Sequence, residues 1–597
     1  MKSQFVADFE TTTDEKDCRV WGWGACEIGN LDNVFIGTTI DEFMDWCEGR
    51  ADNIKVFMHN LKYDSQFLMS WLFNNEFKHV QSKDRATKTF TTIISDKGLY
   101  YCIEVIFWLK GKKIKKVTFW DSLKVIPMSV DEIAKSFKMP FQKLKIDYHA
   151  HNDRPYGSPI TKEEQDYIIN DCRIVAHALD YFQRQGLDKM TIGSCALNEY
   201  KNLIGERQFK NWFPVSRNYF FDVKQGYRGG FTYVEKKFAG KVVKNVMVLD
   251  VNSMFSYVMK EKLLPYGTPV YYKGEYKQDK LFPLYVQMLE CQFELKKGKI
   301  PTIQIKDSLN FSAHKYLESS DDEIMQLVLN SNDLELFFEN YEVYNLNFIG
   351  GWKFKAVAGL FDDYVDKWMG MKIKAEEEDN PGLRLVSKLY LNSLYGKFGA
   401  GVTRKTKKPY MDEDGVVKLK DGELELVDGV YIAMASFITS YARCTIIRAA
   451  QKIKDDYAAG KSNIQYVYSD TDSLHILSPD GEIPEGIEID QKKLGAFKLE
   501  NICAKGKYLR SKCYINQVII SEKEYEEGRA GEHSNLYSKD KDGFYKLKVT
   551  VAGMPHDCYD QVTFSNFKIN ARYTGKKQPK LVQGGVILEE IDFTINE

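Results

Sequence analysis

The spacing of apolar and polar positions over residues 1–189 predicts short strands that alternate with helices. The clearest helix is TKEEQDYIINDCRIVAHAL, which begins with a capping box formed by Thr161 and Glu164. Its apolar stripe consists of Ile168, Cys172, Val175 and Leu179. KSQFVADFETTT predicts a strand that ends in acidic residues, and VFMHNLKYDSQFLMSWL predicts a strand, a loop and a helix. These elements predict a first domain of mixed α and β structure.

The second part of the chain follows a junction predicted in GLDKMTIGSCALNEYK. It contains an apolar strand, VMVLD, which ends at Asp250, and a helix around Leu383 to Phe398. YVYSDTDSLHI predicts a hairpin, because β-prone residues flank the tip formed by Asp470, Thr471 and Asp472. Two charged stretches that contain glycine predict loops or exposed hairpins: Thr403 to Asp428 and Ser521 to Lys546.

The composition is that of a globular protein with several domains. The chain has 597 residues, of which 44% are hydrophobic, and a formal net charge of -1. This balance neither indicates nor excludes a polyanionic partner, which would need locally clustered Lys and Arg. The 11 cysteines form no C-x-x-C pair, which argues against a zinc ribbon and for a reducing compartment. With no apolar signal segment and no run of about 18 apolar residues, we expect a soluble cytosolic protein.

Two like charges separated by one residue form the tip of the predicted hairpin. Residues i and i+2 of an extended segment face the same way, so one of the two aspartate pKa values should rise unless a cation intervenes. A D-x-D pair alone is more typical of a solvated turn, and an EF-hand is excluded because His475 and Gly481 stand where its loop needs Gly and Glu. The presence of Asp250 at the end of another apolar strand makes a metal site the favoured interpretation. Carboxylates at two strand ends could hold two divalent ions about 3.5–4 Å apart, an arrangement that catalyses in-line phosphoryl transfer.

The helix RLVSKLYLNSLYGKFG has one polar face. Its members at i, i+4, i+8 and i+11 are Arg384, Lys388, Asn392 and Tyr395. An amphipathic surface helix would explain this pattern. So would a face that offers two cations to a triphosphate and one ring to a base. Lys372 lies upstream within reach of the same site, and Gly396 would permit close backbone approach.

The N-terminal acids form a second set. Asp8 and Glu10 share one face of a strand, Asp64 follows HNLKY, and Tyr167 and Asp171 share a helix face at i, i+4. Each acid alone is typical of a solvated surface. Four acids and a tyrosine on elements that could converge suit a two-metal 3′–5′ exonuclease of the DEDD type.

Three other signals are weaker. AAGKS ends like a phosphate-binding loop, but Asp455 stands where that motif needs its first glycine. His149 and His151 lack a clustered acid or cysteine pattern, so a loop is favoured over a metal site. The basic stretch from Lys568 to Lys580 suits a solvated face and a surface that tracks phosphates equally well.

The motifs together resemble those of family B DNA polymerases. DVNSMFS is similar to motif A, KLYLNSLYGKF to motif B and YSDTDS to motif C, while KCY and YRGG resemble the K-x-Y and Y-x-G-G elements. DFETTT, HNLKYD and YIIND resemble the three exonuclease motifs. The match is collinear over nearly the whole chain and fits the protein-primed bacteriophage subgroup, of the phi29 DNA polymerase type.

The resemblance implies a multidomain fold of the α/β and α+β classes. An RNase H-like DEDD exonuclease domain would cover 1–189, and a right-hand polymerase domain would cover 190–597. Within the polymerase domain the resemblance implies a palm with a first insertion at about 265–359, fingers at about 360–398, a second insertion at about 399–431, further palm at about 432–545 and a thumb at about 546–597.

The resemblance also implies roles for individual residues. The polymerase metals would be bound by Asp250, Val251 and Asp472, with the catalytic Asp470 close by. The incoming nucleotide would contact Lys372, Arg384, Lys388, Tyr395 and Phe255. The primer-template would contact Tyr227, Gly229, Gly230, Asn392, Gly396, Thr471, Lys512 and Tyr514. The exonuclease metals would be bound by Asp8, Glu10, Asp64 and Asp171, assisted by Tyr167 and by Lys143, for which Lys145 is an alternative. Single-stranded DNA would contact Thr11, His59, Asn60, Tyr63, Ser122 and Leu123.

Two residues depart from motif A. Phe255 stands where the family has Tyr, and Ser256 where it has Pro. The family's ring packs against the sugar and excludes ribonucleotides; Phe keeps that bulk, so we expect the exclusion of a 2′-hydroxyl to survive while nucleotide affinity shifts. The sequence gives no account of Ser256, and none of Arg443, which lies in FITSYAR on a matching helix.

The function implied is that of a DNA-directed DNA polymerase with a proofreading 3′–5′ exonuclease. Its partners would be primer-template DNA, dNTPs and a terminal protein that primes processive, strand-displacing replication of a linear phage-type genome. Mg²⁺ is expected in both sites, although hard oxygen ligands also suit Mn²⁺. The chain would act as a monomer in the cytoplasm of an infected bacterium. The rivals are an exonuclease-centred repair enzyme with weak polymerase activity and a non-catalytic DNA-binding module; the intact Asp250 and Asp472 argue against both.

Overall fold

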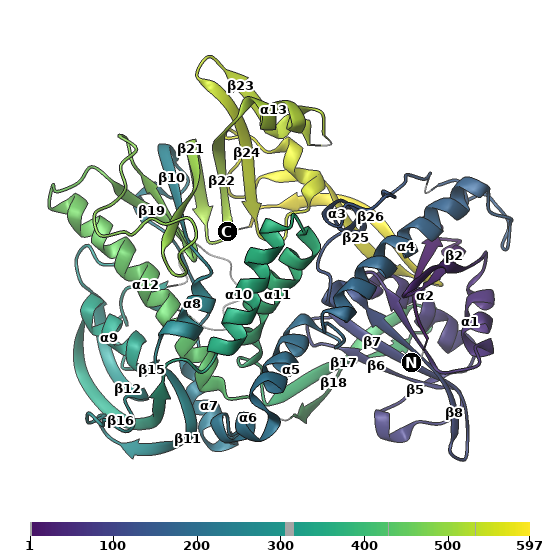
Figure 1. Cartoon of the computed structure of the whole chain (residues 1–597), viewed down its shortest axis with the longest axis horizontal. Coiled ribbons are helices and arrows are strands. Elements are labelled where there is room, and N and C mark those ends of the chain that lie inside the picture. Colours follow the sequence, from purple (N-terminus) through teal and green to yellow (C-terminus); the bar gives the residue numbers. More distant parts are fainter. Residues whose placement is uncertain (1–2, 148, 305–315, 428, 532, 597) are drawn as a thin grey trace.

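An eight-stranded mixed sheet, in the order β3-β2-β1-β4-β8-β7-β6-β5, forms the N-terminal domain of this computed structural model (Figure 1). The structure describes residues 3–596 apart from 148, 305–315, 428 and 532. The strands are β1 (Gln4–Thr11), β2 (Val20–Glu27), β3 (Asn30–Gly37), β4 (Ile54–Met58), β5 (Lys78–His79), β6 (Thr89–Ile94), β7 (Tyr100–Lys110) and β8 (Lys113–Asp121). The helices are α1 (Ile40–Gly49), α2 (Leu61–Asn74), α3 (Val130–Ser136) and α4 (Lys162–Arg184).

Helices cover both faces of this sheet because β1 is apolar on both sides. Phe5 packs in the same cluster as Phe43 of α1 and Leu68 of α2. Val6, the next residue, packs instead with the cluster that contains Cys172 of α4. Successive side chains of a strand point to opposite faces, so α1 and α2 lie on one side of the sheet and α4 on the other.

A second eight-stranded sheet, in the order β23-β24-β22-β21-β10-β20-β19-β9, carries Asp250 and the DTD hairpin, and we call it the palm sheet. Its strands are β9 (Phe231–Val234), β10 (Val242–Val251), β19 (Gln465–Thr471), β20 (Ser473–Leu477), β21 (Phe497–Arg510), β22 (Cys513–Ile520), β23 (Tyr537–Asp540) and β24 (Gly543–Val551). One face packs on α12 (Ile432–Ala458), where Leu249 meets Ile447. On the other face Val248 packs with Tyr468 and Tyr514.

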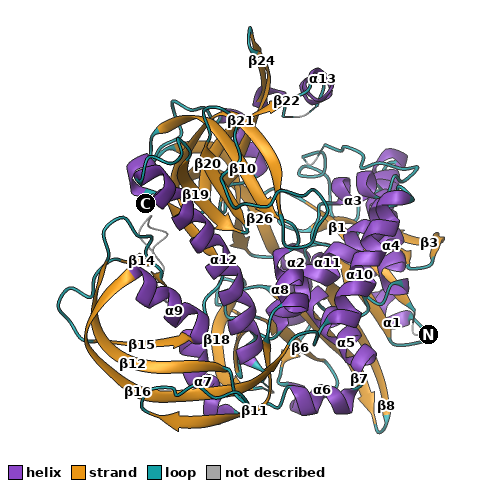
Figure 2. Ribbon diagram, turned by 60° about the vertical axis from the view of Figure 1, so that its left-hand side comes forward, coloured by secondary structure: helices purple, strands orange, loops and turns teal. Residues whose placement is uncertain are grey.

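A helical layer and an inserted sheet flank the palm. The helices are α5 (Ile192–Ile204), α6 (Glu206–Trp212), α7 (Arg217–Gly226), α8 (Met254–Glu261), α10 (Asp362–Glu377) and α11 (Pro381–Lys397). The inserted sheet contains β11 (Leu264–Lys273), β12 (Leu284–Leu295), β15 (Met325–Asn330) and β16 (Tyr341–Val357), with α9 (Ser331–Asn340) and the short pair β13 (Ile303–Gln304) and β14 (Tyr316–Leu317). Figure 2 shows α12 between this sheet and the palm sheet, and α12 contacts both.

Two hairpins meet on the N-terminal domain. They are β17 (Thr403–Met411) with β18 (Val417–Leu426), and β25 (Arg572–Val582) with β26 (Gly585–Thr594). Val417 of the first and Val586 of the second share one apolar cluster with Phe67 of α2. Segments about 500 residues apart in sequence are therefore joined by burial of apolar surface.

The structure confirms the predicted capped helix, the DTD hairpin and the α11 helix, and it corrects the prediction for Ser521 to Lys546. The predicted junction contains helix α5, which Thr191 caps by accepting a hydrogen bond from Ser194 N. The stretch Ser521 to Lys546 was expected to be loop or hairpin, yet it contains α13 (Glu522–Arg529), capped by Ser521. Buried Tyr525, against Phe544, anchors that helix. β24 pairs with β22 in the palm sheet up to Val551.

Parts of three predictions lie outside the described residues: 305–315 in the first insertion, 428 and 532 in the charged stretches. All 11 cysteines are buried and unpaired. Within the described residues, no helix is long and apolar enough to cross a membrane.

Candidate active sites

Asp250 and Asp472 meet at the end of three neighbouring palm strands. β10 pairs antiparallel with β20, which brings Asp250 opposite Ser473. Val251 N donates a hydrogen bond of 2.9 Å to Asp472 O, which fixes the hairpin tip against the end of β10. Burial raises the pKa of Asp472 to about 6, and repulsion by Asp250 adds to this effect. Burial also raises the pKa of Asp250. A pair of carboxylates that resists ionisation is suited to divalent cations.

The hairpin tip is a turn rather than extended strand. Thr471 has φ 65°, and Asp472 N donates to Asp470 O at 2.7 Å. The expectation that Asp470 and Asp472 share one strand face is therefore wrong at this point. Asp470 forms an ion pair with Lys512, and the largest charge effect on Asp472 comes from Asp250 rather than from Asp470.

The predicted primer-binding motifs lie beside this tip. Lys512 occupies the turn between β21 and β22 with φ 54°, and its backbone N donates to the hydroxyl of buried Tyr468 at 2.9 Å. The ring of Tyr514 packs 5.0 Å from that of Tyr468. A Cβ on Gly230 would lie 2.6 Å from Thr471 Cγ2, so the YRGG element can approach the tip only with glycine there.

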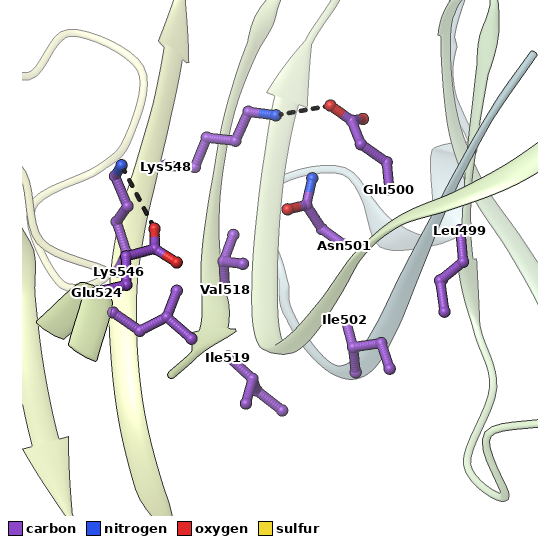
Figure 3. A pocket seen from close by; sticks show the side chains of 10 residues that line it. Leu499, Glu500, Asn501, Ile502, Val518, Ile519, Glu524, Lys546 and Lys548 are labelled. Atoms are coloured by element: carbon purple, nitrogen blue, oxygen red, sulfur yellow. Dashed lines mark hydrogen bonds and ion pairs between the residues drawn. The ribbon is translucent and has the colours of Figure 1, made fainter. Parts of the chain in front are cut away.

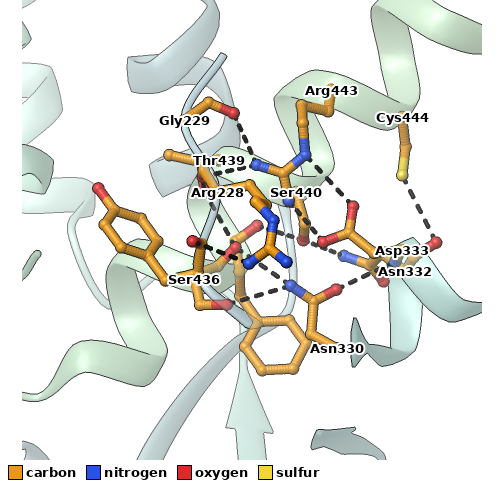
Figure 4. A network of polar contacts seen from close by, with 12 residues as sticks. Arg228, Gly229, Asn330, Asn332, Asp333, Ser436, Thr439, Ser440, Arg443 and Cys444 are labelled. Atoms are coloured by element: carbon orange, nitrogen blue, oxygen red, sulfur yellow. Dashed lines mark hydrogen bonds and ion pairs between the residues drawn. The ribbon is translucent and has the colours of Figure 1, made fainter. Parts of the chain in front are cut away.

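Arg443 holds the YRGG element from behind (Figure 4). Its Nη1 donates to Arg228 O at 2.6 Å and to Gly229 O at 2.7 Å. Its Nη2 pairs with Asp333 of α9, and both side chains are largely buried. Arg443 of α12 therefore connects α9 to the loop before β9, the strand that pairs with β19 of the DTD hairpin. The sequence could not indicate this role, because the three segments are far apart in the chain.

The polar face of α11 is confirmed. Arg384, Lys388 and Asn392 are exposed, as is Gly396, while Val386, Tyr390 and Leu394 are buried. Lys372 of α10 is half-buried, and burial lowers its pKa. Tyr395 stacks on Phe255 of α8. Ser256 is fully buried in the first turn of α8, where proline would also be accepted; within the described residues its hydroxyl has no hydrogen-bond partner.

A cavity of about 230 Å³ lies over the carboxylates. Besides Asp250, Asp470, Asp472, Lys512 and Tyr514 it is lined by Val248, Ser473, His475, Glu500, Asn501, Asn516 and Lys548. A wider cavity of about 630 Å³ continues from it, and Glu500, Asn501 and Lys548 line both (Figure 3). Figure 3 shows Lys548 reaching toward Glu500, at 3.4 Å. Sequence reasoning missed Glu500 and Lys548, which line this cavity, and Lys498, which pairs with Asp250. Only the register between neighbouring strands brings these residues to the site.

The four N-terminal acids lie near enough to affect one another's pKa values. Asp8 and Glu10 come from β1, Asp64 from the first turn of α2 and Asp171 from α4. Burial raises the pKa of each one. Mutual repulsion adds to this: Asp171 raises the pKa of Asp8, and Asp8 raises those of Glu10 and Asp64. Lys143 Nζ lies 3.3 Å from Asp171 Oδ2, which favours Lys143 over Lys145. Tyr167 is buried one turn before Asp171.

The predicted single-strand contacts form two hydrogen-bonded pairs beside these acids. Thr11 Oγ1 and Tyr63 OH are 2.7 Å apart. His59 Nδ1 lies 2.9 Å from Ser122 Oγ. Asp121 Oδ1 accepts from the backbone N of Asn60 at 3.1 Å and from that of Leu123 at 3.0 Å. Asp121 thereby fixes the loop at Asn60 and the turn at Leu123. None of the sequence motifs indicated this residue.

The donor sets fit divalent cations of the Mg²⁺ type. Asp171 Oδ1 is buried, and within the described residues it has no hydrogen-bond partner. In the same residues no group of three His, Cys, Asp or Glu side chains is arranged around one point. That arrangement is compatible with Mg²⁺, which takes one or two carboxylates and completes its shell with substrate phosphate and water.

The weaker sequence signals resolve as structural features. His151 stacks on Trp21 with ring centroids 3.7 Å apart and its Nε2 lies 2.9 Å from Glu164 Oε1, so it belongs to the core. His149 contacts Thr13. AAGKS ends α12 and begins a turn. Lys580 of the basic stretch pairs with Glu15 and Glu589.

Comparisons with known proteins show the family and the fold of this chain. The family described as DNA polymerase type B, organellar and viral, matches residues 47–158 and 151–482. The DNA polymerases of Bacillus phage M2 and Bacillus phage phi29 are 42% and 41% identical to this chain, over 100% of it and 100% and 99% of their own lengths. A solved complex of phi29 DNA polymerase with primer-template DNA and incoming nucleotide substrates is similar with a TM-score of 0.89 and 40% identity, over 100% of both chains.

Proposed function

This chain belongs to the organellar and viral type B DNA polymerases, and we propose that it replicates a linear phage-type genome by protein-primed, strand-displacing synthesis with 3′–5′ proofreading. It is a DNA-directed DNA polymerase of the phi29 type. The observation that carries the finer proposal is the presence of two acidic centres in one chain. One is Asp250 with Asp472 opposite the cationic face of α11, and the other is the cluster on β1, α2 and α4.

The polymerase centre would transfer a nucleotidyl group. The primer 3′ oxygen attacks the α-phosphate, and pyrophosphate leaves. Lys372 and Lys388 would hold the triphosphate with Arg384 assisting, and the rings of Phe255 and Tyr395 would pack against the sugar and the nascent base pair. Lys512 and Tyr514 would hold the primer end.

The exonuclease centre would hydrolyse the last phosphodiester of a frayed primer. Thr11, Tyr63, His59, Asn60, Ser122 and Leu123 would hold the single strand, and Lys143 and Tyr167 would assist the acids. In both reactions divalent ions, when bound, activate the attacking oxygen and stabilise the leaving oxygen. We propose Mg²⁺ as the natural ion, held by Asp250, Asp472 and the Val251 carbonyl in one site and by Asp8, Glu10, Asp64 and Asp171 in the other.

Protein priming and processivity rest on the two insertions. The sheet of β11, β12, β15 and β16 spans the first insertion, and the β17–β18 hairpin the second. The β17–β18 and β25–β26 hairpins share an apolar cluster with α2, which supports a ring around the DNA. A Ser, Thr or Tyr hydroxyl of a terminal protein would accept the first nucleotide, and the enzyme would act as a monomer in the host cytoplasm.

The test uses a 5′-labelled primer on a longer template with Mg²⁺, with and without dNTPs. Extension with dNTPs and shortening without them is the expected result. Shortening under both conditions would contradict polymerisation and favour the repair-enzyme alternative. Adding a terminal protein to a blunt origin duplex, with labelled dNTP, then tests priming: a nucleotide-labelled protein supports it, and label found only on DNA contradicts it.

A further inference from the structure

Lys498 lies beside Asp250 on the next strand of the palm sheet. β10 and β21 pair in a register that sets these two residues opposite each other, so their side chains share one face. Lys498 Nζ lies 3.1 Å from Asp250 Oδ2, with side chains 34% and 21% exposed. The ammonium group therefore competes with a divalent cation for a carboxylate oxygen that polymerisation would need.

The same ammonium belongs to the cationic region under the fingers. Burial is the largest cause that lowers the pKa of Lys372, and repulsion by Arg384, Lys498 and Lys388 adds to it. The charge of Lys498 on β21 therefore adds to the positive potential that Lys372, Arg384 and Lys388 create between the palm sheet and α10 and α11. Glu376 offsets part of this repulsion, since it pairs with Arg384 and raises the pKa of Lys372. The remaining positive charge favours an anion in this region.

The three acids of the palm site differ in their basic partners. Asp470 pairs with Lys512 and Asp250 with Lys498, whereas within the described residues Asp472 makes no ion pair. Lys512 belongs to a recognised primer-binding motif, but Lys498 belongs to none. Within the described residues, Lys498 both pairs with Asp250 and lies near enough to the cations of α10 and α11 to lower the pKa of Lys372.

We propose that Lys498 is a positioning residue that neutralises Asp250 in the free enzyme and moves to the triphosphate of the incoming nucleotide when Asp250 takes up its metal ion. This inference rests on the proposed function, because it assumes that the nucleotide binds between the palm and α11. A partly exposed ion pair is weak and exchanges readily. The flexible four-carbon stem of lysine permits the movement.

The test compares Lys498→Met and Lys498→Arg with Lys244→Met, which removes an exposed lysine elsewhere on β10. Mn²⁺ alone is titrated by electron paramagnetic resonance into chains that also carry Asp8→Ala and Asp171→Ala, so that the exonuclease acids do not contribute. Lys498→Met should bind Mn²⁺ roughly three- to tenfold more tightly, because Asp250 has lost its competitor. The same change should raise KM for dNTP by roughly three- to tenfold with less effect on kcat.

Tighter binding of Mn²⁺ together with weaker binding of dNTP distinguishes this role from a structural one, because a damaged site would weaken both. Lys498→Arg should restore most of the nucleotide affinity, and Lys244→Met should change neither constant. Mn²⁺ binding that is unchanged or weakened in Lys498→Met, or an unchanged KM for dNTP, would overturn the proposal. Primer extension by the unmodified chain is measured in parallel. If it fails, the proposed function fails; if it succeeds while Lys498→Met keeps the original KM, only this inference fails.

Discussion

The rings of Phe255 and Tyr395 stack with centroids 4.1 Å apart and planes inclined by 15°. One ring comes from the helix after Asp250 and the other from the cationic helix of the fingers, so the stack joins two halves of the polymerase site. Stacking fixes the position of Phe255 without a hydroxyl group. We therefore expect that a phenylalanine in motif A can still present a rigid ring to the sugar.

Phe255→Val should relax the exclusion of ribonucleotides. Removing the ring opens space where a 2′-hydroxyl would otherwise clash, so the ratio of kcat/KM for dNTP to that for rNTP should fall by roughly 10- to 100-fold. Single-nucleotide insertion kinetics measure it. Phe255→Tyr is the control and should keep the ratio; a wild-type enzyme that readily incorporates ribonucleotides would refute the role of the ring.

Asp472→Asn should stabilise the metal-free protein at neutral pH. The native pKa of Asp472, about 6, lies above the ordinary value of 3.8, so the charged carboxylate costs folding free energy. That cost is absent near pH 4, grows as pH rises to about 6 and is constant above it. The variant should therefore exceed the wild type by about 1–3 kcal/mol at pH 8 and by little at pH 4.

Unfolding in EDTA, measured at several pH values, supplies the comparison. Because other groups also titrate, only the difference between variant and wild type is diagnostic. Divalent ions should reduce this difference by stabilising the wild type. A difference that does not depend on pH would show that burial does not shift this carboxyl.

Arg443→Met should destabilise the polymerase domain. It leaves the largely buried Asp333 without its cation and the carbonyl of Gly229 without its donor from Arg443, at a cost of about 3–5 kcal/mol. The carbonyl of Arg228 keeps its hydrogen bond from Thr439. Denaturant unfolding measures stability, and primer-template titration should show weaker binding because the YRGG element loses its support. Arg448→Met, on the same helix with exposed ion pairs to Glu335 and Glu339, should cost under about 1 kcal/mol. Equal costs for both variants would contradict this account.

Gly584→Ala should detach the β25–β26 hairpin from the exonuclease domain. Gly584 has φ 89°, and a Cβ there would lie 2.2 Å from Cys18 O. Because this hairpin would help to form the proposed ring around the DNA, its detachment should make the enzyme release the template earlier. Products made in the presence of an excess DNA trap should therefore become shorter. Gly553→Ala is the matched control, since it has φ 82° but open space around its Cβ, and it should keep product length. Short products from both variants would attribute the effect to backbone strain instead of lost docking.

Local pattern was enough to predict the elements that carry the acids. Asp250 and the DTD tip end apolar strands, and Asp171 lies on a strongly amphipathic, capped helix. Their convergence could be inferred because metal sites need several acids together. The turn at Thr471 could not be predicted, because the alternation of apolar and polar residues does not indicate a left-handed backbone conformation at one position.

Partners fixed by register or by long-range packing could not be predicted. In the sequence Lys498 is a lysine on a strand like many others, and only the pairing of β21 with β10 brings it to Asp250. Asp121 likewise stands at the end of a strand, and its role follows from the start of α2 next to it. Arg443 gains its role from α9, more than 100 residues earlier. Helix α13 was not predicted, because most of its residues are charged and Tyr525 alone is buried, so the segment has no apolar stripe.

The most direct test of two separate acidic centres in one chain compares Asp472→Ala with Asp8→Ala on the same labelled primer-template. Asp472→Ala should abolish extension and leave degradation intact, because only the palm pair is broken. Asp8→Ala should abolish degradation and leave extension intact. Loss of both activities in either variant, with the fold unchanged by circular dichroism, would contradict the assignment of polymerisation and degradation to separate sites.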